Sequence, residues 1–305
     1  MTETLKLRRS DLSAICRSAA DVSAAGQRQT KLLVRTELVT LIGAGAAGVH
    51  GLHVGSSKLD LLAAVAGVLF LVSFGCLTYR SISKPENRWY AGRAGAESLR
   101  TLAWRYAVGG DPFPTALPEQ DAAELYLDRV ERILAALKDL ELAPTAPDDR
   151  ELTPTMQRVR AAPFEARRAV YQRDRIENQI RWYADRAAQH ERLARLWLRV
   201  AALASLAGVV AAGFRLFGGV EVDLLGVAAS CASAAIAWNQ LNQHRALVAA
   251  YRVTGQELAI IRDRSDHVAE PKWRSFVSDA EDAVSREHTL WLARHGHPGL
   301  STDPG

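Results

Sequence analysis

Apolar residues are concentrated in two regions of the chain, and each region holds two long stretches. Each stretch has about 17 to 22 residues, close to the ~20 with which an α-helix crosses ~30 Å of hydrocarbon. The stretches are Leu38–Val54, Leu59–Tyr79, Leu196–Phe217 and Val222–Trp238. No segment alternates apolar and polar residues for long enough to predict a strand. The pattern predicts an all-α integral membrane protein; the alternative is a soluble protein with a core of buried Ala-rich helices.

Short loops join the stretches in pairs, so each pair is predicted to form a transmembrane helical hairpin. The loops read GSSK and GGVE. Lysine and arginine mark the cytoplasmic side of a membrane protein, and they gather at the base of both hairpins. Arg28, Lys31 and Arg35 precede the first hairpin, whereas its loop carries only Lys58. Both hairpin tips are therefore expected outside, with both termini and the other segments in the cytoplasm.

The two halves of the chain match in hydropathy when one is shifted by about 160 residues. The first hairpin then falls on the second, and Arg35 falls on Arg195. We therefore predict a tandem repeat in which each copy has one hairpin and its own cytoplasmic stalk helices. The predicted parts are a first unit at 1–142, a Pro-rich linker at 143–155, a second unit at 156–295 and a flexible tail at 296–305.

The segments outside the hairpins carry the apolar periodicity of helices. A stalk helix is expected directly after the second span, where Ser83 and Glu86 have the spacing of a capping box, and a pair of glycines is expected to end it. Pro118–Leu142 is predicted to be an amphipathic helix. A helix from about Phe164 is expected to run into the third span, and the fourth span to run on into a second stalk.

The sequence lacks the motifs of phosphate-binding loops, dinucleotide-binding folds, zinc proteases and serine hydrolases. The cysteines, Cys16, Cys76 and Cys231, form no metal-binding pattern and are predicted to be small buried residues in a reducing compartment. We therefore expect no catalytic site, metal or cofactor, and no enzymatic activity. The net charge of +4 is modest and comes almost wholly from arginine, so no nucleic-acid partner is expected.

Aromatic and arginine residues crowd the expected stalk helix, Lys84–Ala107. Arg93 lies four residues before Glu97, and Arg100 lies three after it, so both can pair with this carboxylate on one helix face. The favoured interpretation is structural: the aromatic rings lock the stalk against neighbouring helices or lipid headgroups. A cluster of arginine and aromatic side chains can also hold the phosphate and base of a nucleotide.

The fourth span is rich in alanine and serine, and small residues let helices approach closely in lipid. Ser230, Ser233 and Ala234 form the candidate pore or packing face of this span. The face either packs the four helices of one chain together or joins the subunits of a homo-oligomer.

Several segments resemble a known family. The segment WYAGRAGAESLRTLAWRYAVGGDPF, after the first hairpin, resembles the signature of the bacterial SLATT domains (SMODS and SLOG-associating 2TM effectors). The segments YQRDRIENQIRWYADRAAQHERLARLW, AWNQLNQHRALVAAYRVTGQEL and FVSDAEDAVSREHTLW resemble a second SLATT variant. The signature residues in the first stalk are Trp89, Arg93, Glu97, Trp104 and Arg105.

The resemblance implies a membrane effector in the bacterial cytoplasmic membrane, found beside nucleotide second-messenger synthases and nucleotide-sensing proteins. The family's proposed role is pore formation that disables an infected cell. We therefore expect a conditional pore in antiviral defence that acts in the lipid bilayer as a homo-oligomer, with a nucleotide second-messenger sensor or synthase as partner. The alternative is a non-conducting membrane scaffold or adaptor whose cytoplasmic helices dock a sensor, and an enzyme ranks third.

Overall fold

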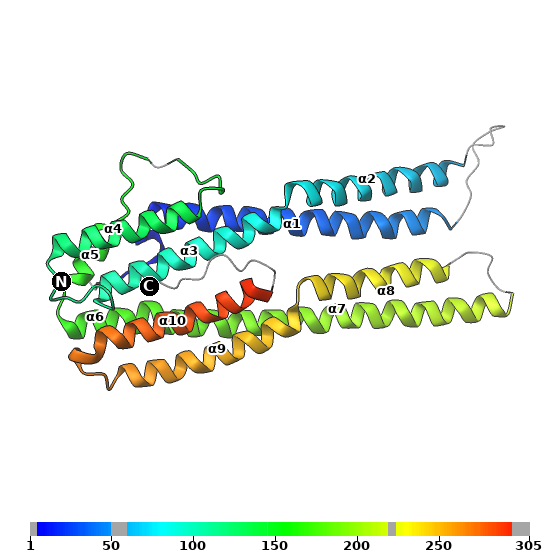
Figure 1. Ribbon diagram of the computed structural model, residues 1–305. Helices are drawn as coiled ribbons and strands as arrows, with labels where there is room; N and C mark the ends of the chain where they lie inside the picture. Colours follow the sequence, from blue (N-terminus) through cyan, green and yellow to red (C-terminus); the bar gives the residue numbers. More distant parts are fainter. Residues whose placement is uncertain (1–4, 50–59, 145, 219–223, 295–305) are drawn as a thin grey trace. The chain divides into compact units, whose positions relative to one another are not determined.

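A computed structural model describes residues 5–49, 60–144, 146–218 and 224–294 of the chain (Figure 1). All regular structure in these residues is helical, which confirms the predicted all-α class. The α-helices are α1 (Ala14–Ala47), α2 (Leu61–Ser83), α3 (Pro85–Val108), α4 (Glu119–Ala136), α5 (Pro154–Arg160), α6 (Phe164–Val170), α7 (Asn178–Leu216), α8 (Leu224–Leu241), α9 (His244–Ser265) and α10 (Glu270–Arg294). A 3-10 turn, Arg9–Asp11, precedes α1, and a π-helical turn, Tyr171–Glu177, joins α6 to α7.

The helices divide into two compact units, and each unit draws segments from both halves of the chain. The stalk unit is formed by Met1–Gly26, Glu86–Arg186 and Ala250–Gly305. The hairpin unit is formed by Gln27–Pro85 and Ala187–Ala249. The hairpin unit contains the predicted membrane spans, and the stalk unit contains most of the segments that were expected in the cytoplasm.

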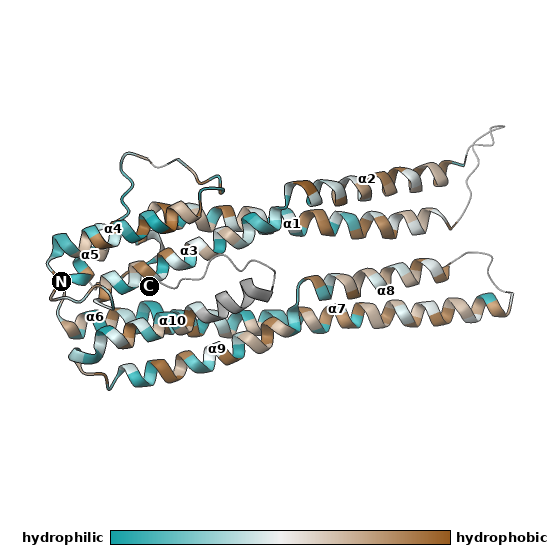
Figure 2. Ribbon diagram, viewed as in Figure 1, coloured by the Kyte–Doolittle hydropathy of each residue, from teal (hydrophilic) through white to brown (hydrophobic). Residues whose placement is uncertain are grey.

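Three helices of the described residues are long and apolar enough to cross a membrane. They are Leu61–Ser83, the stretch Phe164–Leu216 that includes α6 and α7, and the stretch Leu224–Ser265 that includes α8 and α9. Figure 2 shows the apolar colouring of α2, of α8 and of the later part of α7. At most 11% of their apolar windows is buried, which suits a lipid environment rather than water. The expected first span, Leu38–Val54, extends past α1 into residues outside the described part, as do most of both hairpin loops.

Single residues in the left-handed conformation interrupt both helical paths that leave the hairpins. Lys84 separates α2 from α3 with a φ of 40°, and Gln243 separates α8 from α9 with a φ of 47°. The two positions correspond under the internal shift of about 160 residues. The fourth span therefore runs into the second stalk with a break at Gln243 that was not predicted. The helix from Phe164 runs without a gap through the π-helical turn into α7, as predicted. The predicted capping box is wrong, because the Ser83 hydroxyl donates back to the carbonyl of Tyr79 at 2.7 Å.

Large aromatic side chains form the core of the stalk unit. Tyr106 of α3, Tyr126 of α4 and Trp273 of α10 are each at most 1% exposed. The rings of Tyr106 and Tyr126 lie 5.2 Å apart, and Trp273 meets Tyr171 edge-on at 5.7 Å. Aromatic side chains bury large apolar areas and prefer such tilted contacts. This core fixes α3, α4, α10 and the π-helical turn against one another.

Two glycines, Gly92 within α3 and Gly109 directly after it, have structural roles that another residue type would not fill. A Cβ atom on Gly92 would lie 2.8 Å from the carbonyl oxygen of Ala19 and 2.9 Å from the backbone nitrogen of Ser23. Helices α1 and α3 therefore cross backbone to backbone. Gly109 follows α3 with a φ of +77°, a conformation that favours glycine, and the predicted end of the stalk helix is confirmed.

Candidate functional site

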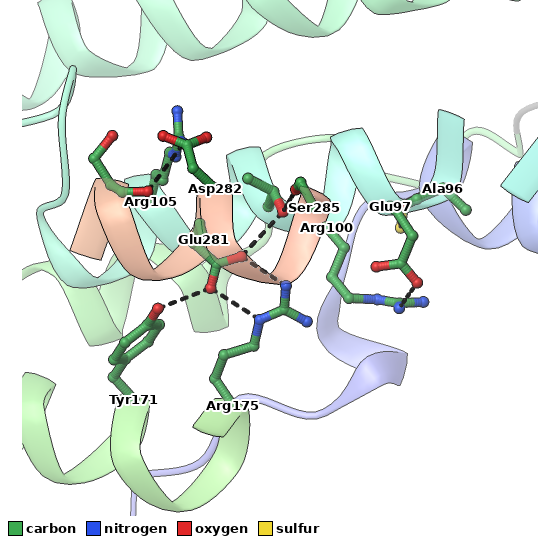
Figure 3. Close-up of polar contacts among 12 residues, drawn as sticks. Ala96, Glu97, Arg100, Arg105, Tyr171, Arg175, Glu281, Asp282 and Ser285 are labelled. Carbon is green, nitrogen blue, oxygen red and sulfur yellow. Dashed lines mark hydrogen bonds and ion pairs between the residues drawn. The ribbon is translucent and has the colours of Figure 1, made fainter. Parts of the chain in front are cut away.

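Glu281 of α10 lies at the centre of a buried polar cluster in the stalk unit (Figure 3). Arg175 donates to both of its carboxylate oxygens, at 2.9 Å from Nε and 2.6 Å from Nη2. The hydroxyl of Tyr171 donates to Oε1 at 2.9 Å, and that of Thr101 donates to Oε2 at 3.0 Å. Each carboxylate oxygen therefore accepts two hydrogen bonds, so the buried charge is paired and its polar atoms are satisfied.

The surroundings of this cluster fix the protonation states of Tyr171 and Arg175. Burial raises the pKa of Tyr171 well above its ordinary value, and the negative charge of Glu281 raises it further. Burial by itself lowers the pKa of Arg175, but the Glu281 carboxylate outweighs burial, so the pKa is raised. Tyr171 is therefore a neutral donor and Arg175 a permanent cation. Neither side chain gains or loses a proton near neutral pH. Tyr171 and Arg175 therefore anchor the Glu281 carboxylate and do not act as a general acid or base.

The π-helical turn Tyr171–Glu177 connects two different parts of the stalk unit. Tyr171 and Arg175 reach α10, as described above. On the same turn, Arg173 donates to the carbonyl of Leu5 at 2.7 Å, and Asp174 accepts from the backbone nitrogen of Leu7 at 3.0 Å. Wide turns of this kind inside α-helices frequently occur at functional sites. Here the turn holds the N-terminal segment and α10 at the same time.

Two buried arginines fasten the C-terminal end of α3. Arg160 donates to the carbonyls of Tyr106 at 3.2 Å and Phe113 at 2.8 Å, and Arg167 donates to the carbonyl of Val108 at 2.9 Å. Burial lowers the pKa of both arginines. The last carbonyls of a helix have no partner within it and carry partial negative charge, so buried cations stabilise this end of α3.

Three of the five predicted signature residues line one cavity of about 770 Å³ in the stalk unit. Arg93, Glu97 and Trp104 all come from α3. The predicted pair between Glu97 and Arg100 is formed, and Arg100 also lines the cavity (Figure 3). The structure therefore brings part of the sequence signature to a hollow in the surface.

The other two signature residues lie outside the cavity lining and hold α3 against neighbouring helices. The ring of Trp89 lies 5.1 Å from that of Tyr90, and its carbonyl accepts a hydrogen bond from the Ser23 hydroxyl of α1 at 2.9 Å. Arg105 donates to the carboxylate of Asp282 on α10 at 2.6 Å. Both contacts suit the structural interpretation of the stalk.

The three residues of the candidate pore or packing face do not share one environment. Ser230 is half-buried and donates to the carbonyl of Gly226 at 2.9 Å, Ala234 is half-buried, and Ser233 is exposed. A Cβ atom on Gly45 would lie 3.3 Å from the hydroxyl oxygen of Ser230. Ser230 therefore lies where α1 of the first hairpin approaches α8 of the second, and a pore-lining role for this face stays a prediction.

The buried residues of the apolar spans are all small. In the described apolar parts of α1, α2, α7 and α8, every buried residue is an alanine, serine or threonine, while large apolar side chains are exposed. These buried residues are Thr40, Ala44, Ser73, Ala201 and Ala235. Small residues allow close contact between helices in lipid. Larger side chains also pack in the hairpin unit: Val34 and His244 are buried, and the Leu69 side chain lies 3.1 Å from the place of a Cβ atom on Gly43.

Sequence reasoning missed the pair formed by Arg175 and Glu281. A signal for Glu281 was present, because Val277 and Val284 lie four residues before it and three after it, on one face of α10, and both are buried. A carboxylate on an apolar helix face requires a buried partner. Arg175 carried no such signal, since the π-helical turn displaces it from the α-helical periodicity and arginines surround it in the sequence.

The described residues contain no cluster of three histidine, cysteine, aspartate or glutamate side chains of the kind that holds a metal ion. His190 and His244 of the hairpin unit do approach each other, with 2.8 Å between their Nδ1 atoms. One of these nitrogens must carry the shared proton. This pair could not be predicted from local patterns, because the two residues come from different helices.

Two family models match the chain. The model of SMODS and SLOG-associating 2TM effector domain 3 matches residues 14–168, and the model of SMODS and SLOG-associating 2TM effector domain 1 matches residues 171–291. No curated protein matches the chain, and no solved structure matches it. The first model alone covers half of the chain, and the second covers most of the remainder. The chain therefore belongs to the SLATT family and is a membrane effector with two tandem SLATT domains of different variants.

Proposed function

We propose that this effector is a conditional pore-forming or membrane-disrupting protein of bacterial antiviral defence. The observation that carries the proposal is the inverted distribution of side chains in the hairpin unit. Large apolar residues such as Phe70, Leu71 and Phe74 face outward, and small or hydroxyl-bearing residues face inward. Hydrophobic constrictions close channels by excluding water. Because the buried positions of the spans hold small residues, the helices need to separate only slightly at these positions to admit water.

The proposed topology places both hairpin tips outside the bacterial cytoplasmic membrane and both termini in the cytoplasm. The distribution of arginine and lysine supports this orientation. In a cysteine-free background, a cysteine introduced by Ser57→Cys should react with an impermeant thiol reagent on intact cells. A cysteine introduced by Ser83→Cys should react only after permeabilisation, and equal reaction on intact cells would contradict the topology.

The effector is further proposed to act as a homo-oligomer without enzymatic activity and without a nucleic-acid partner. Its trigger would come from a nucleotide second-messenger sensor or synthase. The membership in a family of effectors associated with SMODS and SLOG proteins supports this part of the proposal.

Liposome flux tests the pore. The purified full-length chain, reconstituted at increasing protein-to-lipid ratios, should release a trapped ion. When equal amounts of protein are inserted, the double substitution Ser230→Leu, Ser233→Leu should slow ion release strongly. The reason is that leucine replaces two small hydroxyl side chains with larger apolar ones. The control Ile236→Leu, at an exposed position on the same helix, should leave release unchanged.

The same experiment can reject the proposal. No ion release at any ratio, together with an unchanged membrane potential when the chain is expressed in bacterial cells, would favour the non-conducting scaffold.

A further inference from the structure

The cavity beside the stalk signature has the size of a small-molecule site. Its volume is about 770 Å³, within the range of typical ligand pockets. Its walls come from the N-terminal segment, from α1, α3 and α10, and from the π-helical turn with the start of α7. All of these segments belong to the stalk unit.

Positive charge dominates the lining of this cavity. Seven cationic side chains face three acidic ones. The cationic residues are Lys6, Arg8, Arg93, Arg100, Arg173, Arg175 and Arg181, and the acidic residues are Glu97, Asp174 and Glu177. Since the nearby Glu281 neutralises Arg175, the surroundings keep an excess of three positive charges. Like charges held together repel one another, and a bound anion removes this repulsion.

The excess charge is carried by side chains with room to bind a ligand. Lys6, Arg8 and Arg181 form no ion pair within the described part of the chain. By contrast, Arg100 pairs with Glu97, and Arg173 pairs with Asp174. The paired residues give the cavity a fixed wall, and Lys6, Arg8 and Arg181 supply donors for phosphate oxygens.

The wall of the cavity is held in place before any ligand binds. Arg173 and Asp174 fasten the backbone of the N-terminal segment, which carries Lys6 and Arg8. Arg175 is anchored to Glu281 of α10 (Figure 3). A site that is fixed in advance loses less conformational entropy when it binds a ligand.

Aromatic rings also contribute to this cavity. Trp104, Trp182 and Tyr183 line it. The Trp182 ring contacts Tyr183 and Tyr251, and the Arg186 guanidinium lies 5.6 Å from its centre, yet 39% of Trp182 is exposed. An exposed tryptophan surface next to arginines is suited to a planar ring that carries phosphates, because bases stack on aromatic side chains while guanidinium groups bind phosphate. A simple inorganic anion would use only the cationic part.

We propose that this cavity binds a nucleoside phosphate, with its phosphates held by Lys6, Arg8 and Arg181 and its base against Trp182. The site would make the stalk unit itself a receptor for a nucleotide. The proposal concerns binding alone, so it does not depend on whether the hairpin unit conducts.

Calorimetric titration of the full-length chain in detergent tests the site. The probes are purine and pyrimidine nucleoside mono-, di- and triphosphates and their cyclic forms, with adenosine and pyrophosphate as the base-only and phosphate-only arms. At least one nucleotide should bind more tightly than both arms, and its affinity should fall with increasing salt. The double substitution Arg8→Gln, Arg181→Gln should weaken binding by about tenfold or more, because charge-assisted hydrogen bonds are lost.

The control is Arg150→Gln, which removes an exposed cation outside the cavity lining and should leave the affinity unchanged. Thermal unfolding of each variant identifies loss of folding. No binding of any nucleotide by the folded wild-type chain would overturn the proposal. Unchanged binding in the folded double variant would also overturn it, and so would pyrophosphate binding as tight as that of every nucleotide.

Discussion

The guanidinium group of Arg175 and the carboxylate of Glu281 form a two-point ion pair in the interior of the stalk unit, with side chains 3% and 0% exposed. Glu281→Gln would leave the buried arginine without a counter-charge. Removing one partner of a buried pair costs about 3–5 kcal/mol of unfolding free energy. Denaturant unfolding of the full-length chain in detergent measures this loss.

Asp282→Asn is the matched control for this substitution. Asp282 is the next residue of α10 and pairs with Arg105, but its side chain is 62% exposed. Exposed pairs contribute about 0–1 kcal/mol. Equal losses for the two variants would show that burial does not determine the strength of the Arg175–Glu281 pair.

Gly92 and Gly255 should respond in opposite directions to alanine. Gly92→Ala should destabilise the stalk unit by about 1–3 kcal/mol, because its Cβ atom would lie 2.8 Å from a backbone oxygen of α1. Gly255→Ala should stabilise it by up to about 1 kcal/mol, because the new Cβ atom would meet only ordinary contact at 3.8 Å and alanine favours helix. The unfolding midpoints of the two variants, compared with wild type, test this prediction. A stabilised Gly92→Ala chain would contradict the backbone-to-backbone crossing of α1 and α3.

Lys84 should tolerate glycine better than valine, because it lies in the left-handed region between α2 and α3. A side chain with a branched Cβ is strained there, so Lys84→Val should cost about 1–2 kcal/mol of unfolding free energy. Lys84→Gly should be no less stable than wild type. The same pair of substitutions at Gln243, with a φ of 47°, is an independent repetition. Equal stabilities of the glycine and valine variants would argue against these breaks.

The helical class and the membrane spans could be predicted because they depend on local patterns. Apolar stretches of sufficient length give spans, and periodic apolar residues give helices. The break at Gln243 could not be predicted, since neither glycine nor proline marks it. Lys84 precedes a proline, which disfavours helical backbone at the residue before it but does not specify a left-handed conformation.

The candidate site was only partly predictable, because its members come from segments far apart in the sequence. Arg93, Glu97 and Trp104 belong to one local signature and were identified. Arg173 and Lys6 join them only through tertiary folding and the π-helical turn. Periodicity identifies the residues on one face of a helix but not which faces of different helices meet.

Glu151 should make the unfolding free energy depend on pH in an unusual direction. Burial raises the pKa of its carboxyl above 4.5, although hydrogen bonds from Ser13 and Ile15 and the charge of Arg17 oppose this. The folded chain therefore holds this proton more tightly than the unfolded chain. The stabilisation is complete below pH 4.5 and is lost as the pH rises through the pKa of the folded state.

Relative to wild type, Glu151→Gln should therefore raise the unfolding free energy more at pH 7 than at pH 4. Glutamine keeps an oxygen that can accept from the backbone nitrogen of Ile15, at 3.2 Å in the wild type. Denaturant unfolding at the two pH values gives the difference. Glu141→Gln removes an exposed carboxylate from the same unit and is the control. A variant that gains stability at pH 4 rather than pH 7 would reverse the sign and contradict the prediction.

Gly45 and Ser230 should form a disulfide when both are replaced by cysteine in a cysteine-free background. A Cβ atom on Gly45 would lie 3.9 Å from that of Ser230, and disulfides join Cβ atoms about 3.5–4.5 Å apart. Mild oxidation of the Gly45→Cys, Ser230→Cys chain in membranes should give a cross-linked monomer on denaturing gels, because α1 and α8 meet within one chain. Gly67→Cys with Ser230→Cys is the control, since a Cβ atom on Gly67 meets nothing within 4 Å. A cross-linked dimer would instead make this face a contact between subunits, and no cross-link would mean that the two hairpins do not meet at Ser230.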